Sequence, residues 1–432
     1  MLADDGNDNP CKQRQAPCCR CSLEPVPISP RGGSSPPARS MVRLKMRKIV
    51  TKLAVFVGAL FGLLSGDTAA EKVAIPASGT WINVTPSGVD LVNALSCGNY
   101  GTTTMVADPA RPSDLYTQFH CQGVWKSVDY GLTWSGPINT GQGGPGASGA
   151  AGLALARGPD GRPPILYSAG IRGTGLGFWK STDGGLTWTN YRVAPGGDRQ
   201  DFYPPAVNPW DADHLIMCGH EMNLIVQSHD GGRTWSSVPM ADGMHQNGGT
   251  GILFFINTGN PATTTKTWLW TAQGTGGAIG TWRTSNGGVT WARVDDNEHP
   301  HGQMQIYQPD ATGVVYMPGI YSKLGAGVLR STDYGETWIH VGADIYQAAV
   351  FGSPNRVYAM YAWACGSCVI DPALQSTPQP GTSGWARMST PPEMTIGPAQ
   401  TATVFDGTNF IILTANWRGG LWRLIETSTL PR

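Results

Sequence analysis

Two acidic side chains, Asp201 and Glu221, could carry acid–base chemistry if the fold brings them together. Hydrolysis of a glycosidic bond needs two carboxyl groups, one on each side of the scissile bond. One donates a proton to the leaving oxygen, and the other activates water or attacks the sugar. We therefore take Asp201 and Glu221 as the candidate catalytic pair of a hydrolase, with Glu298 as a further acid in reserve.

A second group of side chains fits a different reaction. Cleavage of a uronic-acid polymer by elimination needs a base such as His or Tyr, and a cation that neutralises the sugar carboxylate. The candidate bases are His120, His220, Tyr203 and Tyr321, and the candidate cations are Arg172, Arg199 and Arg418. A lyase is therefore an alternative to the hydrolase.

Further residues are candidates for binding substrate without reacting. Trp363 and Trp417 have flat apolar faces that can stack on the C–H surface of a sugar. Tyr100, His245 and His301 complete the predicted binding residues.

Three histidines leave open a metal site. His299 and His301 are two residues apart, a spacing that places both side chains on one face of a strand, and His245 could join them on a divalent ion. We nevertheless expect neither a bound metal nor a cofactor.

An internal repeat predicts the strands and turns that position these residues. The pattern S-x-D-x-G-x-T-W occurs five times, and Asn replaces the Asp in the fourth copy; the copies begin at Ser127, Ser181, Ser228, Thr284 and Ser331. Its Asp can accept hydrogen bonds from turn amides, its Gly can adopt a positive φ, and its Trp can fill the space between sheets. We therefore expect the Asp residues of the repeat to stabilise the fold rather than to catalyse.

The Trp residues of the repeat give the number of sheets. They recur at intervals of about 50 residues, a period typical of propeller blades, and Trp385 continues the series as a sixth. Trp422 lies in a sequence typical of the third strand of one more blade, and the segment around Trp81 has the composition of its missing fourth strand. The sequence thus predicts an all-β, seven-bladed β-propeller whose ring is closed by the mature N-terminal strand. The candidate residues named above then fall in loops at one mouth of the central channel.

The repeat resembles that of the Asp-box superfamily of propellers, also called BNR or sialidase-like, over residues 79–425. The superfamily includes sialidases, xyloglucanase-type glycoside hydrolases, sortilin-like receptor domains and photosystem assembly factors. No Phe/Tyr-Arg-Ile-Pro segment of the sialidases precedes the first copy, and the rhythm of the first blade is nearest to the xyloglucanase-type propellers. Those enzymes place a catalytic Asp in the loop before the Gly-Val-Trp strand, where this chain has His120.

The N-terminal region predicts export. We interpret residues 1–45 as a disordered or mis-started extension, residues 46–70 as a signal peptide and residues 71–432 as a single propeller domain. Met46-Arg47-Lys48 is followed by a short apolar run and a small-residue exit near Ala70, the order of a secretory signal. The run is shorter than the roughly 20 residues needed to span a bilayer.

Five cysteines remain in the mature chain, at positions 97, 121, 218, 365 and 368. Disulfides are compatible with export, and a local bridge between Cys365 and Cys368 fits their spacing better than half of a zinc site does. The other pairings stay open.

Charge excludes one class of partner. The chain has 30 basic and 30 acidic residues without a basic stripe, so we expect no nucleic-acid binding. We expect a secreted or periplasmic monomer that leaves the membrane after signal cleavage and acts on an oligo- or polysaccharide as a glycoside hydrolase. The alternatives are a polysaccharide lyase and a non-catalytic propeller that binds a glycan or a protein.

Overall fold

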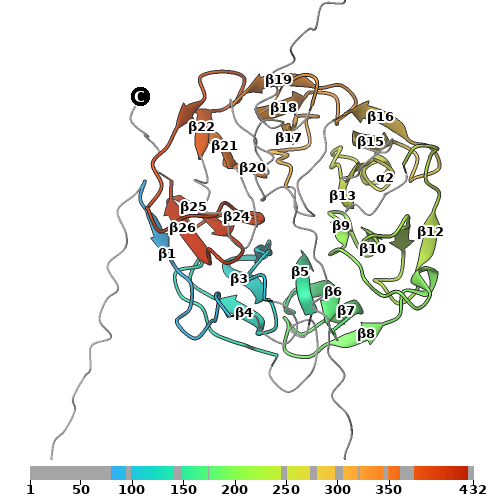
Figure 1. Ribbon diagram of the computed structural model, residues 1–432, viewed down its shortest axis with the longest axis horizontal. Helices are drawn as coiled ribbons and strands as arrows, with labels where there is room; N and C mark the ends of the chain where they lie inside the picture. Colours follow the sequence, from blue (N-terminus) through green and yellow to red (C-terminus); the bar gives the residue numbers. More distant parts are fainter. Residues whose placement is uncertain are drawn as a thin grey trace, which may run out of the picture. The chain divides into compact units, whose positions relative to one another are not determined.

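The computed structural model describes residues 79–93, 99–139, 148–173, 175–244, 251–272, 280–296, 305–319, 322–325, 327–343, 349–360 and 374–426. They all belong to the second of two units into which the chain divides, Pro76–Arg432. They form seven antiparallel sheets arranged around a common centre (Figure 1), which confirms the predicted propeller. The described residues include no helix that is both long and apolar enough to cross a membrane.

Each sheet is one blade, and the blades are numbered along the chain. Blade 1 contains β2 (Val106–Asp108), β3 (Arg111–Phe119) and β4 (Gly123–Ser127), and blade 2 contains β5 (Ser148–Ala156), β6 (Ile165–Gly173), β7 (Gly177–Ser181) and β8 (Thr189–Tyr191). After the 3-10 helix η3 (Ala194–Gly196), blade 3 contains β9 (Ala206–Asn208), β10 (Asp211–Cys218), β11 (Ile225–Ser228) and β12 (Ser236–Val238). Blade 4 contains β13 (Gly251–Phe255), the short helix α2 (Pro261–Thr264), β14 (Trp268–Ala272), β15 (Gly280–Thr284) and β16 (Ala292–Asp295).

The remaining blades complete the ring. Blade 5 contains β17 (Val315–Gly319), β18 (Gly327–Ser331) and β19 (Ile339–Gly342), and blade 6 contains β20 (Ala349–Gly352), β21 (Arg356–Met360), β22 (Gln375–Pro378) and β23 (Ala386–Arg387). Blade 7 contains β24 (Gln400–Phe405), β25 (Phe410–Ala415), β26 (Leu421–Ile425) and β1 (Trp81–Asn83).

Among the described residues, blades 1 and 5 have three strands instead of the predicted four. In blade 1 the outer strand is reduced to a single bridge between Lys126 and Ser135, and Pro137, which has no backbone N–H, lies two residues further on. In blade 5 the inner strand is represented by a bridge between Tyr307 and Tyr316. The segments at Ser135 and Tyr307 therefore stand in place of full strands but form fewer ladder hydrogen bonds than a full strand would.

The ring closes as the sequence predicts. Strand β1 pairs antiparallel with β26, and the register places Asn83 opposite Trp422 and Trp81 opposite Leu424. A second contact crosses the same joint, because Arg423 Nε donates to the carbonyl oxygen of Tyr130 in blade 1 at 3.0 Å. Arg283 makes the matching bond to Tyr334 between blades 4 and 5 at 2.9 Å, so the closing joint is built like an ordinary blade interface.

The hydrophobic core lies between neighbouring blades. The cluster shared by blades 3 and 4 combines Ile216 and Cys218 of β10 with Trp268 and Trp270 of β14. Both indoles are fully buried. Large aromatic groups fill the wedge that opens between adjacent sheets, as the frequency of Trp in the sequence indicates.

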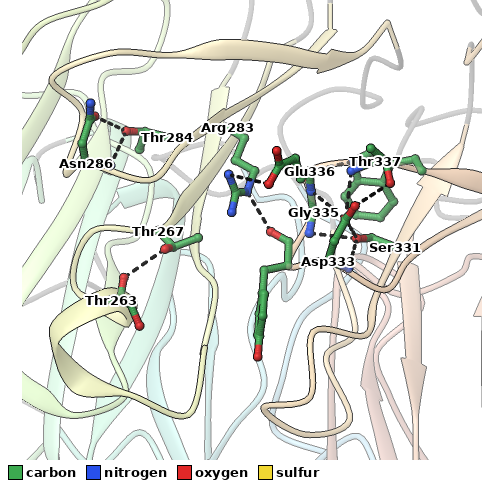
Figure 2. A network of polar contacts seen from close by, with 12 residues as sticks. Thr263, Thr267, Arg283, Thr284, Asn286, Ser331, Asp333, Gly335, Glu336 and Thr337 are labelled. Atoms are coloured by element: carbon green, nitrogen blue, oxygen red, sulfur yellow. Dashed lines mark hydrogen bonds and ion pairs between the residues drawn. The ribbon is translucent and has the colours of Figure 1, made fainter.

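The repeated Asp stabilises the turn through hydrogen bonds, as predicted (Figure 2). In the fifth copy Asp333 accepts hydrogen bonds from the backbone N–H of Thr337 at 2.9 Å and from its hydroxyl at 2.5 Å. The hydroxyl of Ser331 donates to the same carboxylate at 2.7 Å and accepts from the backbone N–H of Gly335 at 2.9 Å. In the fourth copy Asn286 reproduces this arrangement, with its amide nitrogen donating to the side chain of Thr290 at 2.7 Å.

Asp230→Ala in the third copy is expected to lower the free energy of unfolding by about 1 to 2 kcal/mol, because the carboxylate loses its hydrogen bonds from Ser228 and from the backbone and hydroxyl of Thr234. Asp230→Asn should cost much less, since Asn286 shows that an amide fits the same turn. Urea unfolding of the two variants measures the difference. Equal losses for Ala and Asn would contradict the role given to the carboxyl oxygens.

The same turn makes stability sensitive to strong acid. Burial alone raises the pKa of Asp230, but hydrogen bonds from Thr234 and Ser228 outweigh it and lower the pKa to about 2. The stabilisation is therefore complete above the ordinary value of 3.8 and is lost as the pH falls through about 2.

A buried histidine between blades 3 and 4 should make folding stability depend on pH at milder acidity as well. His214 is 1% exposed, its Nδ1 lies 2.7 Å from Thr265 Oγ1, and its ring stacks on His229 with centroids 4.2 Å apart. Burial, and then the nearby charge of His229, lower the pKa of His214 to about 4. Since the folded state resists protonation, stability falls as the pH drops from about 6.5 to about 4, by roughly 3 kcal/mol.

His214→Gln should flatten this dependence, because Gln does not titrate in that range. Urea midpoints of wild type and variant at pH 7 and pH 4.5 make the comparison, with His340→Gln, at an exposed position on β19, as the control. An unchanged pH dependence in His214→Gln would show that other groups cause it.

Candidate functional site

The two ends of the blades differ in what they carry. At one end, which we call the loop face, the second strand of each blade connects to the third, and the chain enters the first strand of the next blade. At the other end, which we call the hairpin face, first strands turn into second strands and the Asp-box turns lie. The antiparallel order of every blade requires this separation.

Blade 3 brings five predicted site residues together at the loop face. His220 donates its backbone N–H to the carbonyl oxygen of Asp201 at 3.0 Å, and its ring packs edge-on against Tyr203 with centroids 5.6 Å apart. His220 Nε2 lies 3.7 Å from Glu221 Oε1. The guanidinium of Arg199 donates to the carbonyl oxygens of His220 and Glu221, each at 3.2 Å.

A tight turn explains how His220 and Glu221 point in different directions. Glu221 has a φ of 51°, in the left-handed region, and Leu224 folds back so that Gly219 donates to its carbonyl oxygen at 3.0 Å. A Cβ at Gly219 would lie 2.6 Å from the end of the Met222 side chain and 2.8 Å from its Cβ, so a larger residue would displace Met222. The side chain of His220 is therefore 8% exposed, whereas that of Glu221 is 44% exposed.

Blade 1 repeats this arrangement at the equivalent position. His120 is fully buried and donates its backbone N–H to Gly101 at 2.8 Å, as His220 does to Asp201. Its Nε2 lies 3.1 Å from the hydroxyl of Thr103, and its ring meets that of Tyr100 edge-on with centroids 6.0 Å apart.

Cys121 follows His120 with a φ of 65°, and it is disulfide-bonded. It stands where Glu221 stands in blade 3, also in the left-handed region. Both loops therefore share a backbone shape and differ in the side chain after the histidine.

Blade 7 supplies Trp417 and Arg418 next to the blade 1 residues. Trp417 is half-buried with a φ of 51°, and its backbone exchanges two hydrogen bonds with Thr102, at 2.8 and 3.1 Å. Arg418 donates to the carbonyl oxygen of Asn99 through Nε at 2.9 Å and through a terminal nitrogen at 2.6 Å. A Cβ at Gly101 would lie 2.2 Å from the carbonyl oxygen of Trp417, so this close approach requires glycine.

Several predicted site residues lie outside the described part of the chain. These are Tyr321, Trp363, His245 and His301, together with His299 of the alternative metal site and Glu298. Arg172 lies at the end of β6, and its side chain is likewise not described. Among the described residues, no group of three His, Cys, Asp or Glu side chains could hold a metal ion.

The arrangement in blade 3 can perform proton transfer. The segments of Asp201 and Glu221 are joined by the backbone hydrogen bond from His220 to Asp201, which brings both acids to the same edge of blade 3. The contacting rings of His220 and Tyr203, with His220 also beside Glu221, provide additional groups that exchange protons.

Thr103 is a site residue that the sequence analysis missed. It occupies in blade 1 the position of Tyr203 in blade 3, because each lies two residues after the backbone oxygen that accepts from the histidine. Alignment of the blades on their histidines would have identified it.

No family model matches the sequence, and a search of curated proteins likewise finds no match. Among solved structures, the chain is similar to the GH74 xyloglucanase from Xanthomonas campestris, with 17% identity and a TM-score of 0.52 over 80% of this chain and 53% of that one. It is also similar to the Niastella koreensis GH74 enzyme, with 16% identity and a TM-score of 0.50 over 74% of this chain and 53% of the other. YCF48 from Cyanidioschyzon merolae aligns with 13% identity and a TM-score of 0.47 over 81% of this chain and 100% of that chain. The chain thus spans about half the length of the two GH74 enzymes, and the likeness shows a shared propeller fold.

Proposed function

We propose that this protein is a carbohydrate-active enzyme that binds an extracellular oligo- or polysaccharide at the loop face and hydrolyses a glycosidic bond. The observation that carries the proposal is the blade 3 cluster, in which His220 contacts Tyr203, lies 3.7 Å from Glu221 and is hydrogen-bonded through its backbone to Asp201. We further propose that the protein is secreted or periplasmic, acts as a monomer, and binds no nucleic acid.

In this mechanism the carboxyl groups have complementary roles. One carboxylic acid protonates the leaving oxygen, while the other carboxylate directs water or attacks the sugar. His220, 3.7 Å from Glu221, can hold a proton beside that carboxylate, and Arg199 fixes the turn by donating to two of its carbonyl oxygens. Trp417 provides an indole on the same face for stacking against a sugar ring.

The GH74 structures support the proposal, because they show that this fold occurs in a xyloglucanase and in a second GH74 enzyme. Function resides in the site rather than in the fold, so the residues of blade 3 carry the argument.

Asp201→Asn and Glu221→Gln should each lower kcat for glycan cleavage by about 100-fold or more, the usual effect of removing a general acid or base. The assay measures new reducing ends released by the purified full chain from a panel that includes xyloglucan, other neutral glucans and uronic-acid polymers. Asp211→Asn, an exposed acid on the hairpin face, is the matched control and should retain full activity. Full activity in both loop-face variants would refute the hydrolase.

The Tyr203–His220 pair beside Arg199 favours a second candidate, elimination on a uronic-acid polymer. That reaction produces an unsaturated uronate, detected by its ultraviolet absorption, and His220→Gln would abolish it while Asp201→Asn would not. Binding of a glycan without any turnover would indicate the non-catalytic propeller instead.

A further inference from the structure

A pocket of about 410 Å³ lies on the side of the ring away from the catalytic candidates. Its walls come from three neighbouring blades, with Tyr307 in blade 5, Phe351 in blade 6 and Phe405 in blade 7 among them. The β20 and β24 strands that contribute to it are inner strands, next to each other in Figure 1. Ser353 and Phe410, in or next to the turns that follow these strands, place the pocket's opening at the hairpin face.

The polar wall of the pocket is built from uncharged groups. The side chain of Gln305 donates to Thr401 Oγ1 at 2.8 Å and accepts from the backbone N–H of Thr401 at 2.6 Å. These bonds join blade 5 to blade 7 across the inner strand of blade 6, where Val350 donates to the carbonyl oxygen of Gln305 at 3.0 Å. Thr403 adds a half-buried hydroxyl two residues further along β24.

A buried network holds the blade 6 wall in place. Glu426 is 3% exposed, and its carboxylate accepts hydrogen bonds from Ser353 at 2.7 and 2.9 Å and from the hydroxyl of Tyr358 at 2.6 Å. Tyr307 donates its hydroxyl to the carbonyl oxygen of Ser353 at 3.0 Å. The hydroxyl, the carbonyl and the backbone N–H of Ser353 are all hydrogen-bonded, which makes this wall a preformed surface.

Two phenylalanines form an apolar edge. Phe405 is 47% exposed, although it is a large aromatic residue, and its ring lies 5.1 Å from that of Phe410 with a tilt of 43°. Exposed aromatic surface beside a concavity with a few fixed polar groups is the usual composition of a small-molecule site.

We propose that this pocket is a second ligand site and that it binds a neutral sugar of one or two rings. No Lys, Arg, Asp or Glu lines it among the described residues, so a charged ligand would lose its hydration without gaining a counter-charge. Hydroxyl and amide groups on one side can bond to sugar hydroxyls, and the Phe405–Phe410 pair offers an apolar surface to sugar C–H groups. The site is independent of the proposed catalysis, because its residues lie on the opposite face.

The test uses methyl glycosides of glucose, xylose and mannose as neutral probes, and methyl glucuronide as a charged probe. Binding to the full chain is measured by saturation-transfer NMR and calorimetry. Thr403→Trp fills the pocket and Phe405→Ala removes its aromatic edge, and each should weaken the best neutral probe at least about tenfold. Phe405 is exposed enough that its truncation spares the core.

Matched controls exclude non-specific effects. Thr408→Trp adds an indole to the same β24–β25 turn outside the pocket, and Ile339→Ala removes an exposed apolar side chain from β19; both should leave binding unchanged. The neutral probe should still bind the Asp201→Asn/Glu221→Gln double variant, and Thr403→Trp should retain glycan cleavage. Equal affinity in wild type, Thr403→Trp and Phe405→Ala, or tighter binding of the glucuronide, would overturn the proposal. Loss of binding in the double variant alone would place the only sugar site at the loop face and would also overturn it.

Discussion

Trp81→Ala is expected to lower the free energy of unfolding by about 3 to 5 kcal/mol, among the largest effects available from one substitution in this chain. Trp81 is 4% exposed and packs with Ile412, Trp422 and Leu424, although it reaches blade 7 from the other end of the sequence. Its strand is short, so the indole supplies most of the apolar contact that holds β1 against β26. Loss of this contact weakens β1, the N-terminal strand that closes the ring.

Trp81→Phe separates packing from hydrogen bonding. In the described structure the buried indole N–H of Trp81 makes no hydrogen bond, so a phenyl ring loses volume without losing a polar partner. We expect this variant to lose much less stability than Trp81→Ala. Guanidinium unfolding followed by Trp fluorescence and by circular dichroism measures both. Wild-type stability in Trp81→Ala would show that the ring closes without this anchor.

Glu426→Leu is expected to destabilise the protein by about 3 kcal/mol or more, because it leaves several buried donors without their acceptor. The carboxylate joins blade 7 to three residues of blade 6, namely Ser353, Asn355 and Tyr358. Burial, and then the charge of Glu426, raise the pKa of the Tyr358 hydroxyl, which stays protonated as the donor that this network requires. In the other blade interfaces that carry such a bond, the second-strand tyrosine donates to a backbone carbonyl oxygen, as Tyr167 does to Ala212 at 2.7 Å.

Glu426→Gln retains one acceptor oxygen and is the control for this prediction. It should lose less stability than Glu426→Leu, and Tyr358→Phe should show a non-additive effect when combined with either. Urea unfolding of the single and double variants provides the coupling energy. Additive losses would show that Glu426 and Tyr358 contribute independently, contrary to the network described above.

The architecture could be predicted from the sequence because its determinants are local and repeated. The spacing of the Asp-box Trp residues predicted the blades and extended to Trp385, and Trp81 was assigned because its segment has the composition of the missing outer strand. The incomplete strands of blades 1 and 5 were not foreseen, since in the described structure only single bridges, at Ser135 and at Tyr307, remain where the repeat predicts full strands.

The candidate site could be predicted in position but not in detail. The order of strands places Asp201, Tyr203 and His220 at the same face, and the structure brings them into contact. That Arg199 and Arg418 donate to backbone carbonyl oxygens depends on turn geometry, which residue type does not determine. The pocket beside Phe405 was also missed, because its three walls come from segments far apart in the sequence.

A crystal structure of Glu221→Gln soaked with an oligosaccharide from the most reactive polymer in the panel tests whether the loop face of blade 3 binds and cleaves a glycan. We expect a sugar within hydrogen-bond distance of Asp201, with Tyr203 and His220 beside it. An oligosaccharide found only at the hairpin face, with the blade 3 loops unoccupied, would contradict it.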